Sequence, residues 1–436
     1  MALETEPLSG MIDIDSETAP TVEKDRLYRL WEEGNWSAKA IDFSQDAIDW
    51  RERMTDETRA ATLWNCALFL DGEESVTVTL APFMAALTRY EDRIFLGTQI
   101  ADEGRHHVFF DRYLREVAGI GSDFASTLAA TRPKLTWGYT QVFTELDRVA
   151  DQIRLHPGNK ALLAQGITIY HLVVEGMLAH TGQHFLREYT AKNQIFPGFL
   201  QGVKLISRDE SRHIAFGIQV LRELVTTYPE CKKAAIAMLN KVLPWAAGVF
   251  TPPDVDWQYI TCLGYTPQEV FSFALRSVET KLRRAGIDPN EVLGLVKLGV
   301  SQPLSEQAQR AVTLVEGGVI GTTNAPRISE PLMDALFASV LDVARWTQSR
   351  HIGLTGTIQW IFEGAAPRYL ELSATDGPTT QVGTAQHPRL TLRCTAADWV
   401  RIAGGRLNQQ RALLNRRLRI SGDWALALRL PQILPI

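Results

Sequence analysis

Two short stretches of the chain repeat a pattern that can hold metal ions. Asp-Glu-x-Arg-His occurs at residues 102–106 and again at residues 209–213, so in both a glutamate is followed three positions later by a histidine. On a helix, positions i and i+3 lie on one face about one turn apart. A carboxylate and an imidazole at this spacing can therefore point at one ion from a rigid backbone. The four candidate ligands are Glu103, His106, Glu210 and His213.

A further glutamate precedes each copy of this pattern by the length of a helix hairpin. Glu73 lies 30 residues before Glu103, and Glu175 lies 35 residues before Glu210. One glutamate from each of two helices, together with Glu-x-x-His from each of two others, is the ligand set of ferritin-like di-metal carboxylate bundles. A single Glu-x-x-His is usually a solvated pair, but the full combination predicts a di-metal site. Glu74 competes with Glu73, and only one of the two can face the metals, because neighbours on a helix point about 100° apart.

Four carboxylates and two imidazoles form an oxygen and nitrogen ligand set. This set suits iron and manganese and disfavours metals that prefer thiolates. Two such ions with room for bridging oxygen can activate dioxygen and oxidise a group nearby, which is the predicted reaction class. Iron storage, as in ferritin, is the alternative use of such a site. The long chain with a second domain argues against a shell-forming subunit.

Length and composition limit the remaining possibilities. The 436 residues allow two or three domains, each with its own core. The formal charge of −5 does not indicate nucleic acid as a partner. Four scattered cysteines fit reduced thiols in a cytosolic protein better than a disulfide framework: Cys66, Cys231, Cys262 and Cys394.

The first twenty residues contain five acidic residues and no lysine or arginine, unlike a signal or transit peptide. No apolar run approaches the roughly 18 residues that a membrane-spanning helix needs. We therefore expect a cytoplasmic protein in which residues 1–22 form a mobile acidic leader.

Residues 23–315 are predicted to form one helical domain, because apolar residues recur with a period of 3.6. The turn-rich stretch 316–329 is predicted to be a linker. Residues 330–436 combine helices with strand-like runs, which predicts a small α+β domain. The fold class is therefore mainly α, a ferritin-like bundle followed by this smaller domain. Helices are expected over 55–87, 89–117, 122–155, 160–189, 230–247, 267–285, 330–350 and 396–403. The helix that holds Glu210 is expected to end near residue 227. Strands are expected over 356–364, 367–374, 388–395 and 417–423.

The end of the chain is basic, with nine arginines and two aspartates from His387 onward. One interpretation is a solvated surface. The other is attraction to an anionic membrane or lipid headgroup, which would give a peripheral membrane contact.

The six ligand positions in their sequence contexts resemble the ribonucleotide reductase small-subunit superfamily. That superfamily usually has its radical tyrosine four residues after the first ligand histidine, and Phe110 occupies this position here. Phenylalanine cannot form a phenoxyl radical. Two branches fit the change: reductase subunits that use a manganese/iron oxidant without the tyrosine, and ligand-binding oxidases derived from the same fold.

The stretches 71–83 and 167–176 resemble the first and third ligand helices of those ligand-binding oxidases. The first helix has a valine three residues after the ligand, here Val76, and the third has a tyrosine five residues before it, here Tyr170. The resemblance implies an ether cross-link between Val76 and Tyr170. Helical spacing alone would put Tyr170 about 140° away from Glu175.

The resemblance covers roughly residues 25–290, including an N-terminal arm at residues 40–50. It implies a mixed Mn and Fe centre, with di-iron as the other possibility, a long-chain fatty acid over the site, dioxygen as co-substrate and a homodimer. It also implies that Asp209 reaches across to His106, since ligating histidines usually donate their other N–H to a carboxylate or carbonyl.

Residues 389–430 resemble the sterol carrier protein type 2 family, whose domains enclose an apolar lipid tunnel. Trp399, the glycines at 404 and 405, and the pair Gly422–Asp423 carry the resemblance. The chain departs from the family at residues 415–417, where Asn-Arg-Arg replaces a glycine before a lysine. A domain used only for dimerisation or solubility is the alternative.

Three functions remain open from the sequence. The first is a dioxygen-activating Mn/Fe oxidase that carries out a two-electron oxidation, binds a fatty-acid-like ligand and is fused to a lipid-binding domain. The second is a ribonucleotide reductase small subunit that lacks the radical tyrosine, although the folded-looking end of the chain and the lack of a tyrosine after Tyr369 disfavour it. The third is a lipid carrier with a non-catalytic metal site.

Overall fold

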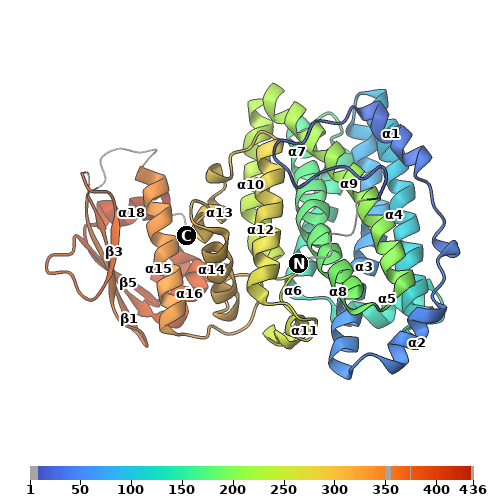
Figure 1. Ribbon diagram of the computed structural model, residues 1–436. Coiled ribbons are helices and arrows are strands. Elements are labelled where there is room, and N and C mark those ends of the chain that lie inside the picture. The colour runs from blue at the N-terminus through green and yellow to red at the C-terminus, as the bar shows by residue number, and fades with distance from the viewer. Residues whose placement is uncertain (1–7, 349–354, 374, 434–436) are drawn as a thin grey trace. The chain divides into compact units, whose positions relative to one another are not determined.

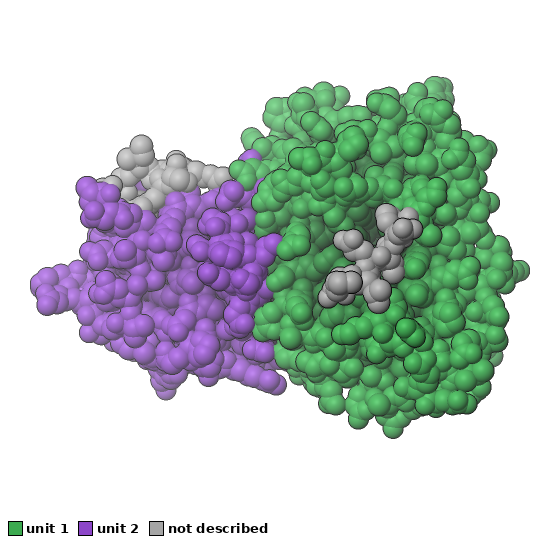
Figure 2. Space-filling view, in the orientation of Figure 1, with its two compact units in different colours: residues 1–288 green, residues 289–436 purple. Residues whose placement is uncertain are grey.

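The structure is a computed structural model that describes residues 8–348, 355–373 and 375–433 (Figure 1). The chain divides into two compact units, Met1–Asp288 and Pro289–Ile436 (Figure 2). This division precedes the linker predicted over 316–329. Helices α13 (Leu293–Leu298) and α14 (Leu304–Glu316) pack against α15 (Glu330–Gln348), so they belong to the second unit.

The first unit is a helical bundle in which three long helices and one π-helix supply the predicted ligands. These are α3 (Asp56–Ala86), α4 (Tyr90–Glu116), η3 (Thr168–Ala179) and α9 (Pro197–Thr227) (Figure 1). The other elements of this unit surround them: α1 (Lys24–Glu33), η1 (Ala38–Ala40), α2 (Ser44–Glu52), α5 (Phe124–Thr131), η2 (Arg132–Lys134), α6 (Trp137–Leu155), α7 (Lys160–Ile167), α8 (His180–Asn193), α10 (Pro229–Ala246), η4 (Pro253–Val255), α11 (Gln258–Thr261) and α12 (Pro267–Arg284).

The prediction of a single helix over 122–155 is wrong. The structure breaks it into α5, the short 3-10 turn η2 and α6. Pro133 lies in that turn, and a proline inside a helix removes a backbone hydrogen bond and clashes with the preceding turn.

One continuous helical stretch, Lys160–Asn193, is long and apolar enough to cross a membrane by length and composition, which the sequence reading did not anticipate. In its most apolar window, 83% of the residues are buried inside the bundle. This is the burial of a core helix, which is apolar all round because other helices surround it.

The mobile leader predicted for residues 1–22 is also wrong for its described part. Residues 8–17, here called the N-terminal strap, pack on the bundle with Ile12 and Ile14 buried. The backbone N–H of Ile12 donates to the hydroxyl of Ser211 on α9 at 3.0 Å. Arg284 on α12 donates to the carbonyl of Asp13 at 2.9 Å. Residues 1–7 lie outside the described residues.

Helix α2 caps the start of the ligand helix α9. The first turn of any helix leaves backbone N–H groups without intrahelical partners. Here the buried carboxylate of Asp46 accepts the N–H groups of Gly198 and Phe199 at 2.8 and 2.7 Å. Asp49 accepts the N–H of Phe196 at 2.9 Å. The arm that precedes the bundle therefore fixes where α9 begins.

The second unit is built on a five-stranded sheet with the order β3-β2-β1-β4-β5. Strand β1 (Gly356–Glu363) pairs parallel with β4 (Leu390–Thr395), and the other pairs are antiparallel. The remaining strands are β2 (Arg368–Leu372), β3 (Thr379–Val382) and β5 (Leu418–Gly422), and the remaining elements are η5 (Pro289–Glu291), α16 (Ala396–Ala403), α17 (Gln409–Leu414) and α18 (Trp424–Ile433).

The core of this unit is aromatic. Trp360 on β1 lies edge-on to Phe337 on α15, with ring centroids 5.3 Å apart, and 5.6 Å from Trp399 on α16. The predicted strand-like runs at 356, 367, 388 and 417 became β1, β2, β4 and β5. The edge strand β3 was missed because it has only four residues and is mostly exposed. The predicted fold class, a helical bundle followed by a small α+β domain, is confirmed.

Replacing Asp46 with alanine should lower the free energy of unfolding of the chain by about 2–3 kcal/mol, because two buried N–H groups of α9 would lose a charged acceptor. Urea denaturation followed by far-ultraviolet circular dichroism measures this. Glu52→Ala, on the exposed face of the same helix, is the control and should change stability very little. Equal stability of the Asp46→Ala and Glu52→Ala variants would contradict the capping role.

Candidate metal centre

The six predicted ligand side chains converge at the centre of the first unit, and all are buried. They form two overlapping groups in which one donor atom per residue lies within 4.8 Å of the others. Glu103 belongs to both groups, so it would contribute to the binding of either ion. The groups are Glu73, Glu103, His106 and Glu210, and Glu103, Glu175 and His213.

The two imidazoles face the carboxylates through the same ring nitrogen. His106 Nδ1 lies 3.6 Å from carboxylate oxygens of Glu73, Glu103 and Glu210. His213 Nδ1 lies 3.2 Å from Glu103 and 3.6 Å from the second oxygen of Glu210.

These donor atoms lack partners of their own. His106 Nδ1, His213 Nδ1, Glu175 Oε2 and Glu210 Oε2 are buried without a hydrogen-bond partner. Buried polar atoms are nearly always satisfied, so a group of orphaned atoms of ligand type, all facing one space, fits metal ions. Glutamate and imidazole donors suit manganese and iron.

The pKa values of the ligand carboxylates also indicate a site for cations. Burial raises the pKa of Glu73 and of Glu175 well above the usual range, and neighbouring carboxylates add to the rise. The pKa of Glu103 is also pushed up by burial, but the adjacent His213 and His106 hold it well below the usual range. Carboxylates that resist ionising together in a dry space are stabilised by bound cations.

Each ligand histidine is held from behind by an aspartate of the opposite helix. His106 Nε2 on α4 lies 3.3 Å from Asp209 on α9, as the family resemblance implied. His213 Nε2 on α9 lies 3.1 Å from Asp102 on α4, the corresponding aspartate of the other copy of the motif. In both pairs Nε2–H donates to the carboxylate, which leaves Nδ1 free as a metal ligand.

Arg212 joins these two aspartates. Its guanidinium is 1% exposed and donates to Asp209 at 2.6 Å and to Asp102 at 3.3 Å. Arg105, the arginine of the first copy of the motif, also donates to Asp102. Two tryptophan N–H groups donate to the same aspartates, from Trp36 to Asp209 at 2.7 Å and from Trp31 to Asp102 at 2.9 Å. The repeated Asp-Glu-x-Arg-His was the signal for this symmetry, because both copies supply an aspartate and an arginine.

Tyr170 lies at the centre, contrary to the angle that an α-helix would give. Its hydroxyl donates to Glu103 at 2.8 Å. Gln99 on α4 donates to the Tyr170 hydroxyl at 3.1 Å and to Glu175 at 2.7 Å. Residues 168–179 form a π-helix, in which backbone bonds join residues five apart. Tyr170 and Glu175 are five apart, so the π-helix brings them to nearly the same face.

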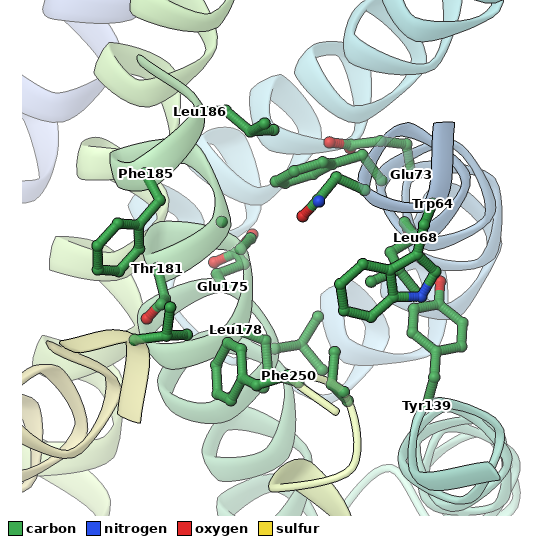
Figure 3. A pocket seen from close by; sticks show the side chains of 18 of the residues that line it. Trp64, Leu68, Glu73, Tyr139, Glu175, Leu178, Thr181, Phe185, Leu186 and Phe250 are labelled. Carbon is green, nitrogen blue, oxygen red and sulfur yellow. The ribbon is translucent and has the colours of Figure 1, made fainter. Parts of the chain in front are cut away.

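An apolar cavity lies beside the carboxylates and is lined by side chains from several helices (Figure 3). Glu73 and Glu175 reach it from different elements, and Trp64, Leu178 and Phe250 form part of its walls (Figure 3). Val76 and Tyr170 line it together with Leu68, Phe69, Tyr139, Phe143, Val174, Thr181 and Phe185.

Phe110 is buried beside this region without a polar group. Its ring stacks on Phe69 with centroids 5.0 Å apart and an interplanar angle of 3°. Phe199 packs edge-on at 6.4 Å. The position of the usual radical tyrosine is thus occupied by a packed aromatic core.

The other histidines near the ligands have different roles. His171 is buried, and burial lowers its pKa to about 3, so its neutral ring donates from Nε2 to Gln99 Oε1 at 3.2 Å. His184 stacks on Phe273 with centroids 4.1 Å apart. His107 packs against Phe124.

Asp102→Asn and Asp209→Asn should each weaken manganese binding by about 10–100-fold, because an asparagine no longer fixes the imidazole behind the ligand nitrogen. Calorimetric titration of the metal-free protein with Mn²⁺ measures the affinity. Asp111→Asn is the matched control, since Asp111 is equally buried on α4 but bonds to Arg115. If all three variants bound Mn²⁺ as tightly as the unmodified chain, Asp102 and Asp209 would not support the ligand histidines.

Comparison with known proteins agrees with this geometry. The family model described as "Ribonucleotide reductase, small chain" matches residues 21–243, and "SCP-2 sterol transfer family" matches residues 337–435. A solved mutant of an R2-like ligand-binding oxidase with an aerobically reconstituted Mn/Fe cofactor is 26% identical, with a TM-score of 0.53 over 60% of this chain and 94% of that one. The R2-like ligand-binding oxidase from Sulfolobus acidocaldarius is also 26% identical, with a TM-score of 0.51 over 62% of this chain and 93% of that one.

The small-chain match covers just over half of the chain and includes all six converging side chains. The C-terminal match falls within the second compact unit. The chain therefore belongs to the ribonucleotide reductase small-chain family and carries a domain of the SCP-2 sterol transfer family.

Proposed function

We propose that the chain is an oxidase that holds a mixed manganese/iron pair, reduces dioxygen, and binds a long-chain fatty-acid-like ligand in the cavity beside the metals. The observation that carries the proposal is the pairing of Tyr170 with Glu103 at 2.8 Å, in a chain where Phe110 replaces the usual radical tyrosine. Further support comes from the solved R2-like ligand-binding oxidases, which carry a Mn/Fe cofactor.

A manganese/iron pair bound by the six side chains would supply the redox chemistry that reduces dioxygen. The chain's own residues set its surroundings. Asp102 and Asp209 would keep both imidazoles in the ligating tautomer, and the mainly apolar cavity walls would limit the access of water to the centre. Gln99 orients the Tyr170 hydroxyl, whose proton is directed at Glu103.

Oxidation at this centre would join Val76 to Tyr170. One hydrogen leaves Cβ of Val76 and one leaves the Tyr170 hydroxyl, and a bond forms between that carbon and the phenol oxygen. The two residues lose two electrons and two protons. With two more electrons, which the bound metal pair would supply, and two further protons from solvent, these two electrons and two protons would reduce one dioxygen to two water molecules. A valine Cβ–H is inert to acid–base chemistry, so only a strong oxidant held close to it could react.

Aerobic loading with Mn²⁺ and Fe²⁺ should produce a chain lighter by two hydrogens, with one peptide that contains both Val76 and Tyr170. Intact-mass and peptide mass spectrometry measure this. Protein loaded without oxygen and the Tyr170→Phe variant should lack the linkage. Separate, unmodified Val76 and Tyr170 peptides from the aerobic Mn/Fe protein would contradict the cross-link.

The ligand proposal depends on the composition of the cavity. Its walls are mainly aliphatic and aromatic, and the metal ligands Glu73, Glu103, Glu175 and Glu210 also line it. A ligand with a carboxylate at one end and a long alkyl chain fits this lining, since the carboxylate can approach the metals while the chain lies along the apolar walls.

We also propose that the second unit binds lipid, on the basis of its match to the SCP-2 sterol transfer family. The full chain would then carry two lipid molecules, one in each unit. This arrangement would let one unit hold a lipid while the oxidase cavity holds another.

Ala179→Trp should remove one of these two lipids, because Ala179 lines the oxidase cavity and an indole would fill it. Native mass spectrometry of the full chain, incubated with a long-chain fatty acid, counts the bound molecules. Leu155→Trp, at an exposed position of α6, is the control and should keep both. If Ala179→Trp kept both molecules, the cavity would not be the ligand site.

A further inference from the structure

The π-helix η3 returns to α-helical geometry at His180, and this junction leaves one carbonyl to be satisfied from outside. In an α-helix the N–H of residue 180 would bond the carbonyl of Gly176, four residues earlier. Here the N–H of His180 donates to the carbonyls of Glu175 and Met177 and bypasses that of Gly176. A buried carbonyl without a donor costs free energy.

Ser277 on α12 supplies the external donor. Its hydroxyl donates to the Gly176 carbonyl at 2.6 Å and is 3% exposed. The two helices approach closely at this point, because a Cβ on Gly176 would lie 3.1 Å from the Lys281 side chain. A glycine in η3 therefore allows α12 to reach the carbonyl.

Lys281 fixes the direction of that hydroxyl. Its buried ammonium donates to Ser277 Oγ at 2.7 Å. An ammonium can only donate, so Ser277 must accept from Lys281 and turn its own proton toward Gly176. Burial lowers the pKa of Lys281 to about 8, so the group is still charged at neutral pH.

Asp15 of the N-terminal strap contacts two residues of this hydrogen-bond network, Lys281 and His180. It accepts from Lys281 at 3.2 Å and lies 3.0 Å from His180 Nε2. His180 is the residue at which the π-helix ends. Burial lowers the pKa of His180 to about 4, so its neutral ring donates to Asp15. The strap thus contacts both the junction and the lysine that orients Ser277.

We infer that Ser277, oriented by Lys281 and Asp15, is a positioning residue that holds the π-helical register of residues 168–179 and thereby keeps Tyr170 and Glu175 on the metal-facing side. In an α-helical register these two residues would point about 140° apart. The role belongs to the metal-free chain, so it does not depend on the proposed oxidation.

Hydrogen exchange of the metal-free, full-length chain tests this role. Ser277→Ala should speed amide exchange in peptides covering residues 168–182 by about tenfold, while peptides from α3, α4 and α6 stay unchanged. Lys281→Met keeps the length of the side chain but removes the donor, so it should speed exchange in the same peptides by a smaller factor. Ser339→Ala is the matched control, because Ser339 also donates to a carbonyl of another helix at 2.6 Å, in the second unit.

A second readout follows Tyr170 itself. The ultraviolet resonance Raman spectrum, taken as the difference from Tyr170→Phe, reports whether the Tyr170 hydroxyl donates to a carboxylate. Ser277→Ala should lose this signature and Ser339→Ala should keep it.

Two results would overturn the inference. One is unchanged exchange and an unchanged tyrosine signature in Ser277→Ala, which would mean that the register does not need this hydroxyl. The other is faster exchange throughout the first unit, which would make Ser277 a residue of general stability. Lys281→Met keeps the test valid if Ser277→Ala fails to fold, since it acts on the same carbonyl through the orientation of Ser277.

Discussion

Four carboxylates share one buried space in the first unit, and their negative charge has to be balanced by the groups around them. Removing a charge from water is costly unless the charge is paired and hydrogen-bonded. Two divalent ions carry four positive charges and would balance the four glutamates, while the imidazoles stay neutral. Behind the ligands, Arg212 lies between Asp102 and Asp209 and offsets part of their charge. Other buried charges of this unit lie apart from the centre and have their own partners, such as Asp46 at the start of α9 and Lys281 beside Ser277.

The identity of the centre could be read from the sequence because its ligands follow helical spacing. Glu103 with His106 and Glu210 with His213 repeat the i, i+3 pattern within the same motif. Sequence spacing could not place Tyr170, because that argument assumes 3.6 residues per turn and η3 does not follow this period. The family resemblance implied that Tyr170 lies beside the metal ligands, and the π-helix gives the physical reason why it does so.

Other features depended on long-range contacts that no local pattern reports. The N-terminal strap reads as an acidic, mobile segment, but Asp15 has two partners, His180 and Lys281, far along the chain. The division between the units was predicted at the turn-rich stretch 316–329. The structure places it after residue 288, because α13 and α14 pack on α15. Turn composition marks where a chain bends, and packing decides which core each helix joins.

The exchange of aspartates between α4 and α9 has a mechanical consequence. Asp102 on α4 holds the imidazole of α9, and Asp209 on α9 holds that of α4. Sliding one helix past the other by one turn, about 5.4 Å, would break both pairs together and would also separate Arg212 on α9 from Asp102 on α4. The two helices therefore behave as one stiff body. The opposite side of the centre is formed by α3 and by η3, whose unusual winding depends on contacts from α12 and the strap. We therefore expect any adjustment that admits a ligand to occur in α3 and η3 rather than between α4 and α9.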